Sequence, residues 1–322
     1  SEGYTARFRV PAGAGNTLVV FDQSSALAPT AVKYVPRNNV SSFVGADYII
    51  VTHRRFAEQA ERLARFRQTH NGFSTFVADI EEIYDAYNHG IADAEALREF
   101  LRDAYHTGKP QPHNVLLFGD ASWDPKFNLA NAKYHNYVPS LGNPVSDALL
   151  GCFDGPDDVL PEISIGRIPV SDEAQAQAAV DKIIEYEQTP SAAWKKNFIF
   201  ISGGLDESEQ QQFKNQTDNL ARDYITVDPT YGRPIFISKA LENPNADFRS
   251  KILETINRGA LWTTFIGHAA SRTWELMFNT PDIDDLANKG RYPFITSMTC
   301  HTGRFAEPTQ ESFSEHFLLA PE

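Results

Sequence analysis

Apolar and polar positions along the chain follow a repeating strand-and-helix pattern. Short apolar and β-branched runs predict buried strands at 47–52, 73–79, 114–121, 162–169, 197–204, 235–238, 259–268 and 293–300. Longer segments between most of these runs predict helices at 56–69, 93–106, 171–187, 208–224, 245–257 and 311–320. Strands that alternate with helices are typical of parallel sheets covered by helices. We therefore expect an α/β protein.

The length and the spacing of loops predict two such units. A chain of 322 residues is long enough for about two domains of roughly 150 residues each. Residues 1–44 are β-like without partners for a sheet of their own, so we interpret them as the tail of a preceding β-rich region. We expect a first α/β subdomain over 45–190, closed by Thr189-Pro190, and a second over 191–322. The chain stops without a further strand, so the second subdomain is expected to be incomplete at its C-terminus.

Composition narrows the class of partner. A hydrophobic content of 42% with 12% aromatic residues supports substantial cores. The formal charge is −13 without a strong cluster of basic residues, which argues against nucleic acids and anionic membranes because both require a basic surface. No apolar run reaches the ~18 residues of a membrane span. Two cysteines, Cys152 and Cys300, are too few for a disulfide framework or a cysteine-rich zinc site.

Two apolar strands of the second half end in a reactive side chain. T-T-F-I-G-H ends at His268, and F-I-T-S-M-T-C ends at Cys300. Sites in open α/β sheets collect at the carboxyl ends of strands, and the single crossover at 280–289 allows these strands to be neighbours. An imidazole beside a thiol is what activation of a thiolate requires. Either residue alone is more often structural, so a core cysteine and a nucleophile both remain open.

Further blocks of sequence carry a resemblance to a known family. The chain resembles peptidase family C25, the gingipain-like cysteine peptidases, which share a fold group with caspases and legumains. Besides F-I-G-H and the strand that ends in cysteine, the similar blocks are N-V-L-L-F-G-D-A-S-W-D-P (114–125), D-G-P-D-D-V-L-P-E-I-S-I-G-R-I-P-V (154–170), V-D-K-I-I-E-Y-E and S-M-T-C-H-T-G-R-F-A-E-P-T. Together these blocks cover about residues 45–320 in order. The resemblance implies two consecutive caspase-like subdomains with mostly parallel sheets flanked by helices.

The resemblance also implies catalytic roles. Cys300 matches the nucleophile, His268 the general base and acid, and Glu162 the carboxylate that orients the histidine. The oxyanion hole would use the backbone N–H groups of Cys300 and Ala269. The family usually has glycine after the histidine, so Ala269 is a departure that would distort the hole if a positive φ is needed. His301 is a rival base, ranked lower because neighbours on an extended strand point to opposite faces.

Candidates for the walls of the substrate pocket are Ile266 and Met298, two residues before His268 and Cys300, together with Trp274. Asp172 or Glu173 could add a carboxylate that selects Arg or Lys in the substrate.

Two turns suggest ion binding. Asp154, Asp157 and Asp158 could bind a structural Ca²⁺, because hard cations prefer several oxygen ligands on a turning loop. The run lacks EF-hand spacing, and a solvated acidic loop is the alternative. No cofactor is required for the chemistry itself. The Gly203-Gly204 turn before a helix is a weak phosphate candidate, and the acidic L-D-E-S-E that follows disfavours an anion.

These observations lead to one main functional hypothesis. We expect a cysteine endopeptidase that acts on peptide or protein substrates through a Cys–His dyad and an acyl-enzyme. The alternatives are a sortase-like transpeptidase of the same family, of the type IX secretion kind, and a catalytically silent peptide-binding module. The resemblance further implies a secreted or cell-surface bacterial protein.

Overall fold

The computed structural model describes residues 34–35, 38–155, 157–228, 231–243 and 245–320. The chain divides into two units, Ser1–Arg37 and Asn38–Glu322, and the description below concerns the second. The expected β-rich segment at 1–44 lies largely outside the described residues. Among those that are described, Val40–Ser42 form a short 3-10 helix rather than a strand.

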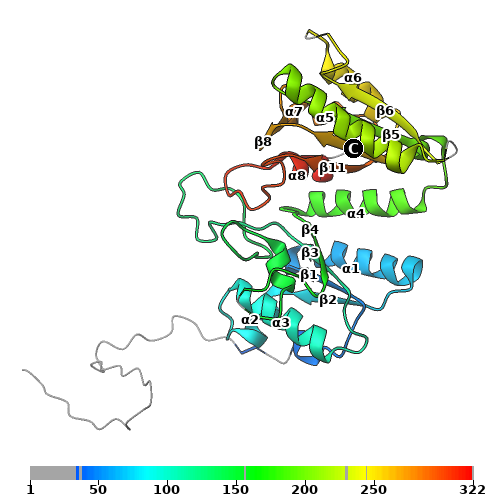
Figure 1. The fold of residues 1–322 in the computed structure, drawn as a ribbon. Coiled ribbons are helices and arrows are strands. Elements are labelled where there is room, and N and C mark those ends of the chain that lie inside the picture. The colour runs from blue at the N-terminus through cyan, green and yellow to red at the C-terminus, as the bar shows by residue number, and fades with distance from the viewer. Residues whose placement is uncertain (1–33, 36–37, 156, 229–230, 244, 321–322) are drawn as a thin grey trace, which may run out of the picture. The chain divides into compact units, whose positions relative to one another are not determined.

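The first half builds a four-stranded parallel sheet (Figure 1). Its strand order is β2-β1-β3-β4, with bounds β1 Tyr48–Thr52, β2 Thr75–Asp79, β3 Asn114–Phe118 and β4 Ser164–Ile168. Alternate residues of these strands enter two cores. Ile49 and Val51 pack toward helices α2 (Ile80–Tyr87) and α3 (Ala94–Thr107). Ile50 packs toward α1 (Ala57–Phe66) and α4 (Glu173–Gln188) on the other face.

The second half repeats this plan. Its parallel sheet has the order β11-β7-β5-β6, with bounds β5 Asn197–Ser202, β6 Arg233–Ser238, β7 Trp262–Ile266 and β11 Phe294–Met298. The covering helices are α5 (Glu207–Leu220), α6 (Phe248–Asn257), α7 (Thr280–Ile283) and α8 (Phe313–Leu319). A small antiparallel sheet of β8 (Ala269–Ala270), β9 (Thr273–Trp274) and β10 (Phe278–Asn279) follows β7 directly.

The α/β prediction is therefore confirmed, and most predicted elements occur close to their expected positions. Helix α2 was not predicted; Asp79, the last residue of β2, caps it by accepting the N–H of Glu81 at 3.1 Å. The crossover helix α7 is shorter than the 280–289 segment expected. The two sheets divide between β4 and β5, while residues 38–322 form one compact unit. A subdomain boundary at residue 190 remains a prediction.

Helices α4 and α8 lie between the two sheets (Figure 1). Leu319 of α8 belongs to the core of the first sheet, whereas Phe313 at its other end belongs to the core of the second. The Lys182 ammonium of α4 donates to the carbonyl of Ala320 at 2.6 Å. One short helix at the end of the described chain thus ties both halves together.

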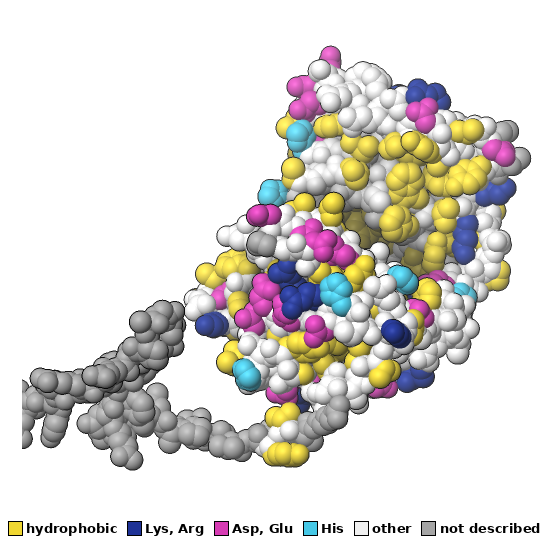
Figure 2. Space-filling view, turned by 60° about the horizontal axis from the view of Figure 1, so that its bottom comes forward, with side chains coloured by type: hydrophobic (Ala, Val, Ile, Leu, Met, Phe, Trp, Pro, Cys, Tyr) yellow, Lys and Arg dark blue, Asp and Glu magenta, His cyan; other side chains and the backbone are white. Residues whose placement is uncertain are grey.

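Hydrophobic side chains gather around a hollow on the face shown in Figure 2. A pocket of about 440 Å³ with a largely apolar lining is formed by α4, α6, α7, the start of β11 and α8. Neither His268 nor Cys300 lines it. In the part of the chain that is described, no helix is both long and apolar enough to cross a membrane.

Two buried carboxylates lie where α8 meets the first sheet. Asp120 follows β3 and accepts hydrogen bonds from the Ser171 hydroxyl at 3.0 Å and the Ala121 N–H at 2.8 Å. Glu315 of α8 accepts the Ser312 N–H at 2.7 Å. Burial raises the pKa of Asp120 to about 7. Burial, reinforced by the charge of Asp120, raises the pKa of Glu315 to about 8.

These pKa values predict a stability that falls as pH rises. Between about pH 4 and pH 8 these two groups bind fewer protons in the unfolded chain than in the folded chain, so their contribution to the free energy of unfolding decreases as pH rises. Each pKa unit corresponds to about 1.4 kcal/mol. Glu315→Gln keeps an acceptor for the Ser312 N–H, and we expect it to flatten this decline in urea denaturation between pH 5 and 9. The exposed carboxylate Glu61, replaced by Gln, is the control; equal slopes in all three proteins would contradict the prediction.

Candidate active site

The ends of β7 and β11 bring the predicted dyad to one edge of the second sheet. The two strands pair in parallel, and their last paired residues are Ile266 and Met298. His268 and Cys300 each follow two residues later, so they leave adjacent strands at the same level. The expectation that these strands are neighbours is confirmed. The thiol of Cys300 is free and exposed.

The chain turns sharply after Cys300. The N–H of Thr302 donates to the carbonyl of Cys300 at 2.8 Å, and His301 has a left-handed φ of 61°. Alternation along an extended strand therefore does not apply at His301. The His301 side chain is therefore not constrained to face away from Cys300, and the preference for His268 depends on the surroundings of His268 itself.

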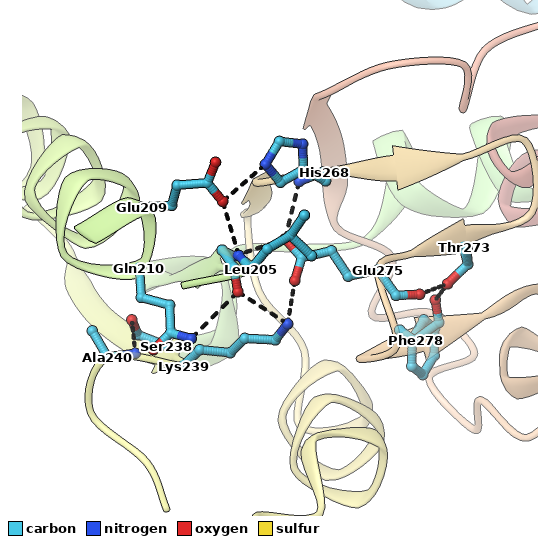
Figure 3. A network of polar contacts seen from close by, with 11 residues as sticks. Leu205, Glu209, Gln210, Ser238, Lys239, Ala240, His268, Thr273, Glu275 and Phe278 are labelled. Atoms are coloured by element: carbon cyan, nitrogen blue, oxygen red, sulfur yellow. Dashed lines mark hydrogen bonds and ion pairs between the residues drawn. The ribbon is translucent and has the colours of Figure 1, made fainter. Parts of the chain in front are cut away.

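The His268 ring lies against the first turns of α5 (Figure 3). Its Nε2 atom is 3.1 Å from Oε2 of Glu209, and the Phe213 ring meets it edge to face with centroids 5.8 Å apart. Glu209 and Phe213 are four residues apart, so they occupy one face of the helix. The imidazole is thus oriented by one carboxylate and one aromatic ring, while 46% of its side chain remains exposed.

Glu209 is itself held in place by the start of α5. Asp206 caps the helix by accepting the Glu209 N–H at 2.9 Å. The Oε2 atom of Glu209 also accepts the Leu205 N–H at 2.9 Å, so the same oxygen serves the backbone and the imidazole (Figure 3). A carboxylate held by its own backbone loses little further freedom when it orients a partner.

The structure does not bring Glu162 to the histidine. Glu162 precedes β4 in the first sheet, and its Oε2 accepts the Phe153 N–H at 2.8 Å. The carboxylate that contacts His268 comes from α5 instead, and an orienting role for Glu162 remains a prediction. The sequence contained a usable signal: Glu209 lies in the first turn of a predicted helix that follows a strand adjacent to β7.

This arrangement can perform proton transfer. Ionised Glu209 only accepts hydrogen bonds, so neutral His268 carries its proton on Nε2 and leaves Nδ1 as an acceptor. Such an acceptor nitrogen can take a proton from a donor within hydrogen-bond reach. The carboxylate on the opposite nitrogen then stabilises the imidazolium that forms.

The main chain beyond His268 answers the question raised by Ala269. Ala269 is not among the residues with positive φ, so the absence of glycine there imposes no left-handed strain. The carbonyl of His268 accepts the Glu275 N–H at 3.1 Å. Successive N–H groups of an extended strand alternate in direction. The N–H of Ala269, which begins β8 opposite Trp274, therefore points away from β9.

The predicted substrate walls differ in their surroundings. The exposed fraction of the surface is 64% for Met298 but only 8% for Ile266, which is buried. Trp274 is fully buried in the second core, where its ring stacks on Phe265 with centroids 4.9 Å apart. Its Nε1 donates to the Ser297 hydroxyl at 2.7 Å. The expectation that Trp274 lines the cleft is wrong, since the residue is a core tryptophan that joins the small sheet to β11.

Neither carboxylate that was considered for selecting basic substrates is free. Asp172 caps α4 by accepting the Gln175 N–H at 2.8 Å. Glu173 forms a two-pronged pair with Arg55 at 2.7 and 2.8 Å.

The acidic loop does not gather its carboxylates. Asp158 accepts the N–H groups of Asp154 and Leu160, both at 3.0 Å. Among the residues with a described placement, no group of three or more His, Cys, Asp or Glu side chains is arranged to hold a metal ion. Binding of Ca²⁺ by Asp154, Asp157 and Asp158 remains a prediction.

A cleft that the sequence did not indicate adjoins the turn after Cys300. It has a volume of about 600 Å³ and is lined by Trp123, by residues 142–145 and by residues 303–307. Gly303 follows the thiol by three residues, so the cleft begins within ~11 Å of it along the chain.

Comparisons with known proteins agree with this geometry. The sequence model described as peptidase family C25 matches residues 41–322. No curated protein matches the chain. The crystal structure of the Arg-specific cysteine proteinase gingipain R is 21% identical with a TM-score of 0.68, over 90% of this chain and 61% of that one. The complex of the Porphyromonas gingivalis RgpB pro- and mature domains is also similar. That structure is 21% identical with a TM-score of 0.68, and the match covers 85% of this chain and 60% of that one. The chain thus spans about three fifths of these proteins, and the likeness shows that they share a fold.

The burial of Trp274 gives a direct test of its corrected role. Trp274→Ala removes a buried ring and its hydrogen bond to the Ser297 hydroxyl, so we expect the free energy of unfolding to fall by about 3–5 kcal/mol. The matched change at the exposed Met298, Met298→Ala, should cost less than about 0.5 kcal/mol. Urea denaturation measures both. A Trp274→Ala protein as stable as Met298→Ala would show that the tryptophan lies at the surface.

Proposed function

The chain belongs to peptidase family C25, and on this premise we propose that it is a cysteine peptidase that cleaves peptide bonds through Cys300. His268 is the general base and acid in this proposal, and Glu209 takes the orienting role first expected of Glu162. The observation that carries the proposal is the position of His268. It is fixed by Glu209 at 3.1 Å and leaves the strand next to the one that ends at the exposed Cys300.

The mechanism follows from these positions. His268 accepts the proton of the Cys300 thiol, and the thiolate attacks the carbonyl carbon of the scissile bond. Backbone N–H groups of Cys300 and Ala269 stabilise the oxyanion. The imidazolium then protonates the leaving amine, which departs and leaves a thioester. Water, deprotonated by His268, hydrolyses that acyl-enzyme and restores the thiol.

Substrate contacts are proposed from exposure and position. Met298 presents an exposed apolar side chain two residues before the nucleophile, and Ile266 contributes the paired position on β7. The cleft lined by Trp123 and residues 303–307 extends the binding surface beyond Cys300. The family resemblance further leads us to propose that the protein acts outside a bacterial cell, either secreted or at the cell surface.

A transpeptidase is the second candidate, because the same acyl-enzyme can be attacked by an amine instead of water. The exposed Cys300 leaves space for either nucleophile. A silent binding module is less well supported, since an oriented imidazole has no purpose in passive recognition.

Covalent labelling tests the proposal. We expect peptidyl acyloxymethyl ketones with varied P1 residues to form an adduct at Cys300, detected by mass spectrometry, and not at the buried Cys152. Glu209→Gln should slow labelling by about 10²-fold or more, because the imidazolium loses its counter-charge. The matched change Glu162→Gln should leave the rate within about twofold.

Two outcomes would overturn parts of this proposal. Absence of any adduct at Cys300 with every P1 residue would exclude both enzymes and favour the binding module. Equal effects of Glu209→Gln and Glu162→Gln would remove Glu209 from its role.

The fate of the acyl-enzyme separates peptidase from transpeptidase. With a peptide substrate and millimolar glycine amide, we expect the hydrolysis product to dominate. A conjugate with the added amine as the major product would instead identify a transpeptidase.

A further inference from the structure

A buried ion pair lies directly beneath the contact between Glu209 and His268. We propose that Glu275 and Lys239 form a positioning device that sets the separation of these two residues. The inference rests on the proposed function, because it assigns the pair to the same proton-transfer site. Neither residue contacts Cys300 in this proposal; they act through the backbone that carries the other two.

Glu275 holds His268 by both of its main-chain groups (Figure 3). The Oε1 atom of Glu275 accepts the His268 N–H at 3.0 Å, and the Glu275 N–H donates to the His268 carbonyl at 3.1 Å. Only 2% of the Glu275 side chain is exposed. A backbone fixed at both its donor and its acceptor leaves the imidazole only its side-chain torsions.

The same carboxylate reaches Glu209 by a second path. Its Oε1 also accepts the Gly204 N–H at 2.7 Å. The next residue, Leu205, donates its N–H to Oε2 of Glu209 at 2.9 Å. One oxygen atom of Glu275 therefore fixes the backbone on both sides of the contact between Glu209 and His268.

Lys239 connects this carboxylate to a third strand. It follows β6 directly and forms an ion pair with Oε2 of Glu275. Its ammonium also donates to the Gly204 carbonyl at 3.3 Å, and its own N–H donates to the Ser202 carbonyl at 3.1 Å. The carboxyl ends of β5, β6 and β7 thus converge on a single pair of charges.

The surrounding chain leaves space for this carboxylate and little else. A Cβ atom at Gly203 would lie 2.0 Å from Oε1 of Glu275, and one at Gly267 would lie 2.8 Å from it. Glu275 also has a left-handed φ of 50°, a conformation that is strained for a non-glycine residue. Such strain persists only where surrounding contacts determine the conformation, as they do here.

The carboxylate is charged in spite of its burial. Burial alone would raise the pKa of Glu275, but the Lys239 ammonium and the two backbone N–H groups outweigh it and lower the pKa. A buried carboxylate with a single counter-ion remains stable only while that counter-ion is present. Removal of Lys239 would leave an uncompensated charge beneath His268, and the strand ends would move to reach water.

The test uses one single and one double variant. Lys239→Met should lower kcat by about 10- to 100-fold with KM unchanged, because a small displacement of catalytic groups is costly while the substrate surface is untouched. In Glu275→Gln/Lys239→Met the amide oxygen can still accept both N–H groups without a buried charge. We expect log kcat of the double variant to lie at least halfway from the value of Lys239→Met back to the wild-type value. Lys251→Met, which removes the pair with Glu242 in the same half, is the control and should retain full kcat.

A second measurement does not depend on turnover. Alkylation of Cys300 by iodoacetamide, followed against pH, reports how readily its thiolate forms. With Glu209 displaced, the imidazolium loses support, so the midpoint of the alkylation profile should move to higher pH in Lys239→Met and return in the double variant. Amide hydrogen exchange at Gly204 and His268 should accelerate in the single variant Lys239→Met but not in the double variant.

The outcomes distinguish this inference from the proposed function. If wild-type Cys300 alkylates no faster than a simple thiol at any pH, the proposed function fails, and hydrogen exchange still decides whether the pair orders the two segments. If wild-type Cys300 is reactive but Lys239→Met matches it in kcat, pH profile and exchange, the positioning role is wrong. A double variant no better than the single variant would also overturn it.

Discussion

Parallel pairing of β5, β7 and β11 is the constraint on which the rest of this site depends. Parallel strands emerge at the same edge of a sheet, so the residues that follow them must meet. The register of the strands sets the level at which each strand ends, since Ile266 pairs with both Ser202 and Met298. Gly203, Gly267 and Thr299, the residues that follow these three, therefore leave the sheet together. A shift of one residue in any of these pairings would point the functional side chains to the wrong face.

Much of this arrangement was predictable from sequence because it arises from local pattern. The apolar runs that end at His268 and Cys300 predicted strands, and the single crossover between them predicted that they are adjacent. The α/β class follows from the same alternation. Chemistry at strand ends can be recognised without knowing the contacts, because the sheet itself brings those ends together.

The sequence was less informative where a role depends on contacts between distant elements. Glu162 and Glu209 are both acidic residues near the start of a regular element, and only the path of the chain brings Glu209 to the imidazole. Trp274 follows the strand that leads to His268, as a cleft residue would, yet the small sheet turns its ring into the core against Phe265. Helix α2 was missed because its cap, Asp79, is also the last residue of a strand.

The Gly203-Gly204 turn shows how one feature can be interpreted twice. Its form suggested an anion site, and an anion is bound there, but the anion is the carboxylate of Glu275 from the same chain. Gly203 after β5, Gly267 after β7 and Glu275 therefore depend on one another in evolution. A side chain gained at either glycine would expel the carboxylate, so none of the three positions is free to vary unless the others change with it.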